Sequence, residues 1–318
     1  MDRLSIAVVP GDGIGTEIMA EGLKVLHRAA EIHGGLAFDF RQYPWSCRHY
    51  LTTGKMMDDD GLSKLKDHPA ILLGAVGAPG VVPDHVSLWG LLLPIRKSFN
   101  QYVNLRPIKL LAGVPSPLVG KGPEHIDFVV VRENTEGEYS GVGGRVHVGT
   151  PYETALQTAV FTRTATERII RYAFELARKR NKQKRLLSVT KSNACNYSMV
   201  FWDDVFREVG HDYPDIEKTQ AHVDAASMYL ITKPEWFDVV VASNLFGDIL
   251  TDEGAAIQGS IGLAAGANLN PEKRFPSMFE PISGSAPDIA GKGIANPIAM
   301  IWAESRRPQK WVMRSVPT

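Results

Sequence analysis

The amino-acid sequence predicts an α/β protein with a largely parallel sheet, and three observations lead to this prediction. Short apolar runs typical of strands alternate with segments whose apolar residues recur at helical spacing. Of the 318 residues, 44% are hydrophobic and 22% are charged, a composition typical of globular proteins. The sequence contains no internal repeat and no low-complexity segment. At roughly 150 residues per domain, this length predicts about two domains.

The expected elements alternate along the chain. The first strand, 4–9, runs into a glycine-rich turn, and a helical pattern over 16–32 follows, with Thr16 and Glu17 as capping candidates. Further strands are expected at 36–40, 70–76, 128–131, 186–189, 220–223 and 237–242. Further helices are expected at 86–100, 164–178 and 199–209. The segment 111–122 is rich in Pro and Gly, so we expect the chain to pass between domains there.

Charge and cysteine content exclude several classes of protein. The 35 Lys+Arg balance 35 Asp+Glu, which argues against an electrostatic nucleic-acid binder. No apolar run approaches the roughly 20 residues that cross a bilayer, and no signal-peptide pattern precedes the first strand. Two cysteines, Cys47 and Cys195, make no disulfide framework and favour a reducing compartment. We therefore expect a cytoplasmic protein with no nucleic-acid partner and no membrane partner.

The turn Gly11-Asp12-Gly13-Ile14-Gly15 follows the first strand and opens a helix. A dinucleotide fingerprint has the spacing Gly-x-Gly-x-x-Gly and an acidic residue about 20 positions later. Here the third glycine comes one residue early, and no convincing acidic residue follows. Two interpretations stay open: a tight strand-to-helix turn, or a backbone that a ligand approaches closely.

Three arginines are candidate ligands for an acidic substrate. Arg96 lies in a helical pattern, Arg106 precedes a proline, and Arg132 directly follows the strand expected at 128–131. Charged groups at strand ends point into the crevice where open α/β sheets bind ligands. Together the three guanidinium groups could hold a small polycarboxylate through bidentate hydrogen bonds. A structural role for each arginine is the alternative.

Asp248 and Asp252 stand four residues apart in a helical pattern. This spacing places both carboxylates on one helix face, about 6 Å apart at Cβ. Such a pair repels unless a cation lies between the two carboxylates, and Mg²⁺ or Mn²⁺ prefers oxygen ligands. Asp224, which follows the strand at 220–223, could supply a third ligand. An exposed acidic helix face is the alternative.

Lys191 and Tyr139 are candidates for proton transfer. Lys191 follows Leu187-Ser188-Val189-Thr190 at the end of a strand pattern, and beside a divalent cation and arginines its neutral form would be favoured, which suits a general base. A solvated lysine is the alternative. Tyr139 could donate a proton or belong to the core.

The segment 280–297 is rich in Gly, Ala and Pro and too irregular for one helix. Such a loop lets backbone approach a large flat ligand closely. Within it, Asp288 could accept hydrogen bonds from ribose hydroxyls.

Together these motifs resemble the β-decarboxylating dehydrogenases, which include isopropylmalate, isocitrate and tartrate/D-malate dehydrogenases. The resemblance runs from Ile6 to about Ala303. It implies the two-domain α/β fold of isopropylmalate and isocitrate dehydrogenases, which is not a Rossmann fold. The implied NAD-binding domain combines 1–101 with 259–318. The implied second domain, 102–258, carries the substrate and metal sites and the dimer interface.

Within the family, the segments 87–93 and 101–107 look most like the tartrate/D-malate branch. Isopropylmalate enzymes tend to carry a glutamate where Trp89 stands, and isocitrate enzymes carry a serine near Gly90. The segment 222–226 is closer to the isopropylmalate pattern, so 3-isopropylmalate stays open as an alternative to D-malate or tartrate.

The resemblance also implies a role for each candidate residue. The implied substrate ligands are Arg96, Arg106 and Arg132. The implied ligands of Mg²⁺ or Mn²⁺ are Asp224, Asp248 and Asp252. The implied NAD-binding residues are Ile14, Gly284, Ser285, Ala286, Asp288 and Asn296. The resemblance leaves open whether K⁺ also assists.

The implied reaction is the oxidative decarboxylation of a 2-hydroxy dicarboxylic acid. Lys191 would take the hydroxyl proton while hydride passes to NAD, and the resulting keto acid would lose CO₂ with help from the metal. Tyr139 would then donate a proton to the product. In the family, Lys191 and Asp224 reach into the partner's site, which implies a homodimer with shared active sites.

Two departures from the family bear on activity. The family has a histidine where Ser283 stands, and its loss should weaken NAD binding. After Ala303 the family continues through further helices, whereas 304–318 has no apolar helical face and carries net positive charge. We therefore expect a truncated C-terminus. A truncated, non-catalytic or unstable family member is the second alternative.

Overall fold

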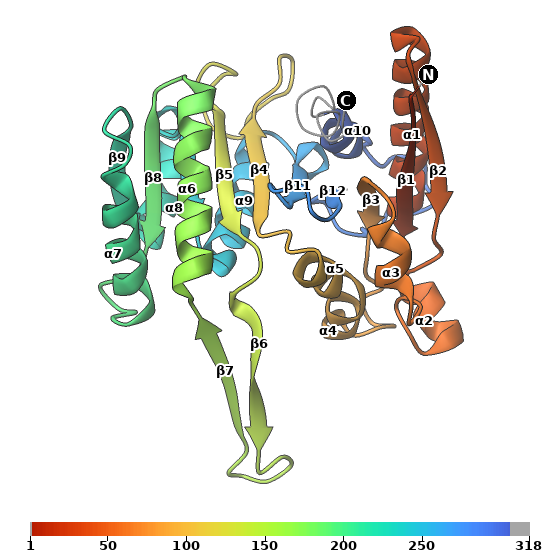
Figure 1. Cartoon of the computed structure of the whole chain (residues 1–318), viewed down its shortest axis with the longest axis horizontal. Coiled ribbons are helices and arrows are strands. Elements are labelled where there is room, and N and C mark those ends of the chain that lie inside the picture. The colour runs from red at the N-terminus through yellow and green to blue at the C-terminus, as the bar shows by residue number, and fades with distance from the viewer. Residues whose placement is uncertain (1, 306–318) are drawn as a thin grey trace. The chain divides into compact units, whose positions relative to one another are not determined.

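The computed structural model describes residues 2–305 (Figure 1), so the expectation about the C-terminus falls almost entirely on residues outside them. The polypeptide divides into two compact units, one of residues 1–101 with 260–318, the other Tyr102–Gly259. The chain passes between the units at Gln101–Tyr102 and Gly259–Ser260, so the predicted passage at 111–122 is wrong. That segment lies within the second unit, where the Ser116 hydroxyl donates to the Ile257 carbonyl at 2.7 Å.

In the first unit, five strands lie in the order β2-β1-β3-β12-β11. They are β1 (Asp2–Gly11), β2 (Leu36–Gln42), β3 (Ala70–Ala75), β11 (Ala265–Leu269) and β12 (Ser277–Pro281). Neighbours are parallel except β11 and β12. β3 is buried along its whole length, which explains its continuous apolar run. β11 and β12 escaped prediction because their sequences mix Gly, Asn, Ser and Pro with apolar residues.

The helices of the first unit include α1, whose C-terminus is closed by Gly34 at φ 72°. They are α1 (Gly15–His33), α2 (Cys47–Thr53), α3 (Gly61–Lys66), α4 (Asp84–Ser87), α5 (Leu93–Ser98), α10 (Ile298–Ser305), the π-helical turn η1 (Leu88–Leu92) and the short η3 (Ile261–Leu263). The helix expected over 86–100 is α4, η1 and α5 in succession. Pro94 has no N–H to donate, so a regular helix cannot run through this segment.

In the second unit, five strands lie in the order β4-β5-β10-β8-β9. They are β4 (Val103–Lys109), β5 (Asp127–Glu133), β8 (Arg185–Thr190), β9 (Glu217–His222) and β10 (Val239–Ala242). β4 is antiparallel to β5, and the other neighbours are parallel. The carboxyl ends of four parallel strands therefore meet at one edge of this sheet, which is the edge where α/β sheets bind ligands.

The helices of this unit are α6 (Arg163–Arg180), α7 (Ser198–Gly210), α8 (Val223–Thr232), α9 (Asn244–Ile257) and the short η2 (Pro234–Trp236). A hairpin of β6 (Gly137–Val146) and β7 (Thr154–Val160) extends from this unit (Figure 1). Most of its residues are exposed, so it lacks the alternating burial that reveals a strand in sequence. Among residues 2–305, no helix has the length and apolarity needed to cross a membrane.

Candidate active site

The candidate catalytic residues of the second unit follow from its sheet. Arg132 lies near the end of β5, Lys191 directly follows β8, and Asp224 lies in the first turn of α8, just after β9. Asp248 lies on α9, which follows β10. β4 runs the opposite way, which pairs its Asn104 with Arg132 and brings the start of β4 to the same edge.

The Asp248 carboxylate receives hydrogen bonds from three of the predicted residues. Its Oδ1 accepts from Arg132 Nη1 at 2.5 Å and from Arg106 Nη1 at 3.1 Å. Its Oδ2 accepts from the Tyr139 hydroxyl at 2.8 Å. Two predicted substrate ligands and the predicted proton donor thus all contact Asp248, which is itself a predicted metal ligand. The guanidinium of Arg132 also lies 5.4 Å from the Tyr139 ring centre.

Both arginines are buried and held by groups that sequence reasoning missed. Asn244 Oδ1 accepts from Arg132 Nε at 3.0 Å and from Arg132 Nη2 at 2.8 Å. Asn104 Oδ1 accepts from Arg106 Nε at 2.8 Å, and the Thr251 hydroxyl accepts from Arg106 Nη1 at 2.6 Å. These partners fix the direction of each guanidinium. Their only sequence signal is that Asn104 and Asn244 are polar residues at strand and helix starts.

Close packing on α9 explains why a glycine precedes Asp248. A Cβ added to Gly247 would lie 2.7 Å from both Cβ and Cγ of Arg132. The helix therefore packs against the base of the Arg132 side chain, which lets Asp248 reach the guanidinium. In the sequence, the glycine directly before Asp248 is therefore the only local sign that α9 packs closely against the site.

Asp252 lies one turn beyond Asp248 on α9, as the spacing predicted. Desolvation raises the pKa of its carboxyl group, and the nearby Asp248 charge raises it further, while Arg106 and Arg132 act in the opposite direction. The two carboxylates therefore repel each other in the absence of a cation, as expected for paired cation ligands.

Lys191 and Asp224 form a separate pair. Lys191 Nζ donates to Asp224 Oδ1 at 2.7 Å, and this hydrogen bond lowers the pKa of the Asp224 carboxyl. The Asp224 side chain is 67% exposed. Within residues 2–305, no three His, Cys, Asp or Glu side chains are grouped closely enough to hold a metal ion. A single chain thus does not gather Asp224, Asp248 and Asp252.

The third predicted substrate arginine, Arg96, belongs to the first unit and lies on α5. It is buried, and its Nη2 donates to Glu280 Oε1 at 2.7 Å; the same oxygen accepts from Asn268 Nδ2 at 2.7 Å. Its Nε, which is also buried, has no hydrogen-bond partner among the described residues. Glu280 was not singled out in the sequence.

The glycine-rich turn packs on the loop that follows β12. The Ile14 amide donates to the Ser285 carbonyl at 2.9 Å, and a Cβ on Gly13 would lie 2.0 Å from that oxygen. The Asp12 carboxylate, which the sequence analysis overlooked, accepts from the Cys47 and Gly77 amides. The structure thus confirms a tight strand-to-helix turn.

The predicted nucleotide-binding residues lie along the same loop. Gly284 and Ala286 have positive φ values of 65° and 39°, so this backbone turns sharply on either side of the buried Ser285. Asp288 is exposed. Asn296 instead caps α10, because its Oδ1 accepts from the Ile298 amide at 3.0 Å.

Comparisons with known proteins show which family the chain resembles. The family model described as isocitrate/isopropylmalate dehydrogenase matches residues 5–307. The chain is 56% identical over 304 residues to D-malate dehydrogenase [decarboxylating] of Escherichia coli, covering 95% of this chain and 84% of that protein. It is 53% identical over 300 residues to tartrate dehydrogenase/decarboxylase of Pseudomonas putida, covering 94% of this chain and 82% of that protein.

A solved structure extends the likeness to the fold. The crystal structure of isocitrate dehydrogenase from Methylococcus capsulatus matches with a TM-score of 0.83 and 35% identity, covering 94% of this chain and 83% of that one. This confirms the predicted α/β fold of the isocitrate dehydrogenase type. The chain therefore belongs to the isocitrate/isopropylmalate dehydrogenase family of decarboxylating dehydrogenases.

Proposed function

We propose that the protein catalyses the NAD-dependent oxidative decarboxylation of D-malate or tartrate. The observation that carries the proposal is the meeting of Arg106, Arg132 and Tyr139 at Asp248. Two buried guanidinium groups suit a dianionic substrate, and a phenol hydroxyl beside them suits proton donation. The activities for which the two relatives above are named support the choice of hydroxy acid.

The residues on α9 fit a divalent cation. Asp248 and Asp252 share a helix face, and the pKa of Asp252 is raised partly by the charge of Asp248. Carboxylate oxygens are the ligands that Mg²⁺ and Mn²⁺ prefer. When bound, the cation would supply Lewis-acid stabilisation of negative charge on the substrate oxygens, and NAD would accept the hydride.

The roles of the chain's own groups follow from their chemistry. Arg106 and Arg132 would bind the substrate carboxylates, and Arg96 stays a predicted ligand of the substrate. Lys191 would accept the proton of the substrate hydroxyl. After CO₂ has left, Tyr139 would donate its proton to the carbon that lost the carboxylate. Arg132 beside the ring of Tyr139 would stabilise the phenolate that remains.

We place Lys191 and Asp224 in the active site of a partner subunit. Lys191 and Asp224 are hydrogen-bonded to each other. Within residues 2–305 of one chain, Asp224 does not form a group of possible metal ligands with Asp248 and Asp252. Apolar side chains near this pair support a homodimer, because Met228, Ile231 and Ile249 are exposed on α8 and α9, which pack together. The β6–β7 hairpin exposes further apolar side chains, and such a two-stranded sheet is marginally stable alone. Burial of these groups in a dimer would remove the apolar surface from water.

The loop over 283–296 is the proposed binding segment for the adenosine half of NAD. Gly284 and Ala286 expose sharply turned backbone, and the exposed Asp288 is free to accept from ribose hydroxyls. A negatively charged Asp288 would disfavour the extra phosphate of NADP, which supports NAD as the cofactor.

A substrate panel tests the proposal. NADH formation is measured with Mn²⁺ and D-malate, tartrate, isocitrate or 3-isopropylmalate, and kcat/KM should be highest for D-malate or tartrate. Lys191→Met and Asp248→Asn should each abolish turnover, whereas the surface controls Lys24→Met and Asp204→Asn should keep it. A preference for 3-isopropylmalate would move the assignment to that substrate. Undiminished turnover in both site variants would refute the proposed roles.

A further inference from the structure

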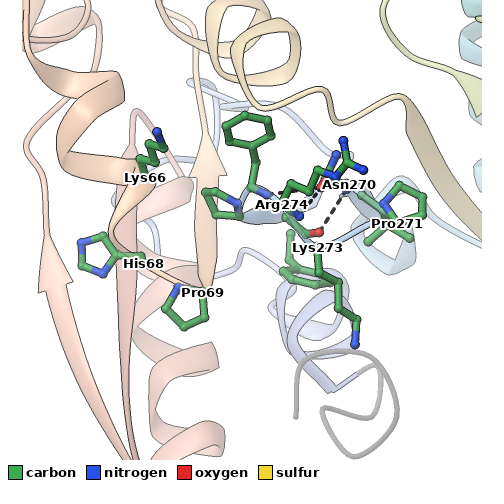
Figure 2. Close-up of a pocket in the computed structure, with 12 residues that line it drawn as sticks. Lys66, His68, Pro69, Asn270, Pro271, Lys273 and Arg274 are labelled. Carbon is green, nitrogen blue, oxygen red and sulfur yellow. Dashed lines mark hydrogen bonds between the residues drawn. The ribbon is translucent and has the colours of Figure 1, made fainter. Parts of the chain in front are cut away.

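A cavity in the first unit lies away from the loops discussed above. Its volume is about 250 Å³, and it is formed by the end of α3, the start of β3 and the turn that joins β11 to β12 (Figure 2). It therefore lies at the amino ends of β3 and β12. The glycine-rich turn and the loop over 283–296 follow the carboxyl ends of β1 and β12, so the cavity is separate from the proposed NAD site.

The cavity is lined by cationic side chains and by no carboxylate. Lys66, Lys273 and Arg274 are among its lining residues, and Figure 2 shows Lys66 on one side and the turn that carries the other two on the opposite side. No ion pair involves these three side chains among residues 2–305. Asp67 follows Lys66 in sequence and Glu272 precedes Lys273, but neither acidic residue lines the cavity. Three cationic side chains thus line one cavity whose lining contains no carboxylate.

The turn that presents Lys273 and Arg274 is held in a fixed shape. Asn270 Oδ1 accepts from the Arg274 amide at 2.8 Å and from the Phe275 amide at 3.2 Å (Figure 2). Asn270 Nδ2 in turn donates to the Asn100 carbonyl at 3.1 Å. Lys273 adopts a left-handed conformation at φ 57°, which is unusual for a lysine. The backbone is therefore organised before any ligand arrives, which lowers the entropy cost of binding.

The opposite wall is equally fixed. His68 is buried, its Nε2 lies 2.9 Å from the Tyr43 hydroxyl, and its Nδ1 lies 3.2 Å from the Ser5 carbonyl. Both ring nitrogens are thus engaged, so His68 serves as wall rather than as a ligand. Lys66 Nζ lies 5.9 Å from the centre of the Phe275 ring, which keeps its charge over the cavity.

The size of the cavity limits the ligand. A volume of about 250 Å³ lies just below the roughly 300 Å³ at which sites for drug-sized ligands begin. A dinucleotide is too large, whereas a small anion with two or more charges fits and would pair with lysine and arginine side chains. We infer that this cavity is a second binding site of the protein, for a small polyvalent anion carried by phosphate or carboxylate groups.

Binding of inorganic pyrophosphate and citrate, measured by calorimetry at constant ionic strength, tests this inference. Lys66→Gln combined with Arg274→Gln should weaken the binding of at least one of them about tenfold or more. The control Arg3→Gln combined with Arg41→Gln removes two exposed charges from the same unit, outside the cavity, and should leave the affinity unchanged. Preference for pyrophosphate over citrate would identify phosphate as the chemistry, and the reverse preference would identify carboxylate.

Hydrogen exchange locates the site and does not depend on the stability of the variants. In the unaltered protein, pyrophosphate or citrate should slow amide exchange over 270–277. Protection only elsewhere, no binding of either anion, or equal weakening in the control variant would overturn the inference.

Discussion

Glu304 on α10 gives the protein a pH-dependent stability that can be calculated from the structure. The residue is 8% exposed, and neither carboxyl oxygen has a hydrogen-bond partner among the described residues. It lies against α1, where a Cβ on Gly22 would be 2.4 Å from Glu304 Oε1. Desolvation by burial raises the pKa of this carboxyl group from 4.5 to about 8.

The sign and size of the effect follow from proton binding. Between the two pKa values the folded protein keeps this proton and the unfolded chain has lost it, so the free energy of unfolding decreases as pH rises. At 1.36 kcal/mol per pKa unit, the full effect is ~5 kcal/mol, of which about 3 to 4 kcal/mol accrues between pH 5 and pH 8. Replacement of the carboxyl by an uncharged amide removes this dependence.

Urea unfolding of Glu304→Gln and the unaltered protein at pH 5 and pH 8 measures the effect. The variant should gain stability relative to the unaltered protein as pH rises, by up to the amount calculated above. Glu31→Gln, which alters an exposed glutamate on α1, should show no such gain. A stability difference between Glu304→Gln and the unaltered protein that is equal at both pH values would refute the reasoning.

Three further changes have defined outcomes. Gly247→Ala should clash with Arg132, lower the stability in thermal unfolding by about 1 to 3 kcal/mol and lower kcat. In the control Gly144→Ala, where a Cβ meets nothing within 4 Å, stability and kcat should stay unchanged. Ser283→His should lower the Kd for NAD in a calorimetric titration, because an aromatic ring would pack against the nucleotide. An unchanged Kd would contradict the expectation that serine at this position weakens NAD binding. Leu156→Asp, on the exposed face of the β6–β7 hairpin, should shift sedimentation from dimer toward monomer, and an unaltered dimer would exclude the hairpin from the interface.

The parallel core of the fold could be predicted from sequence because it has a strong hydrophobic pattern. β3 is a continuous buried apolar run, and such runs identify strands covered on both faces. β4 escaped prediction because it buries the polar side chains of Asn104 and Arg106 between its apolar ones. Their burial depends on hydrogen bonds to groups distant in sequence, so no local pattern reveals it.

The candidate site, too, could be predicted from sequence only in part. The spacing of Asp248 and Asp252 on one helix was sufficient to predict their shared face. The contacts of Asp248 with Arg106 and Tyr139 span more than 100 residues of sequence and follow only from the sheet order. The pairing of Lys191 with Asp224 likewise requires two neighbouring parallel strands, β8 and β9.

In the proposed homodimer, each active site would take Asp248 from one chain and Lys191 from its partner. Co-expression of the inactive variants Asp248→Asn and Lys191→Met tests it, because a mixed dimer of a two-fold symmetric enzyme would contain one intact site. NADH formation from D-malate or tartrate should return to about a quarter of the unaltered level when the two variants mix at random, because half of the dimers would be mixed and each would have one intact site of two. Failure of the mixed dimers to recover any activity, with both variants folded and dimeric, would contradict it.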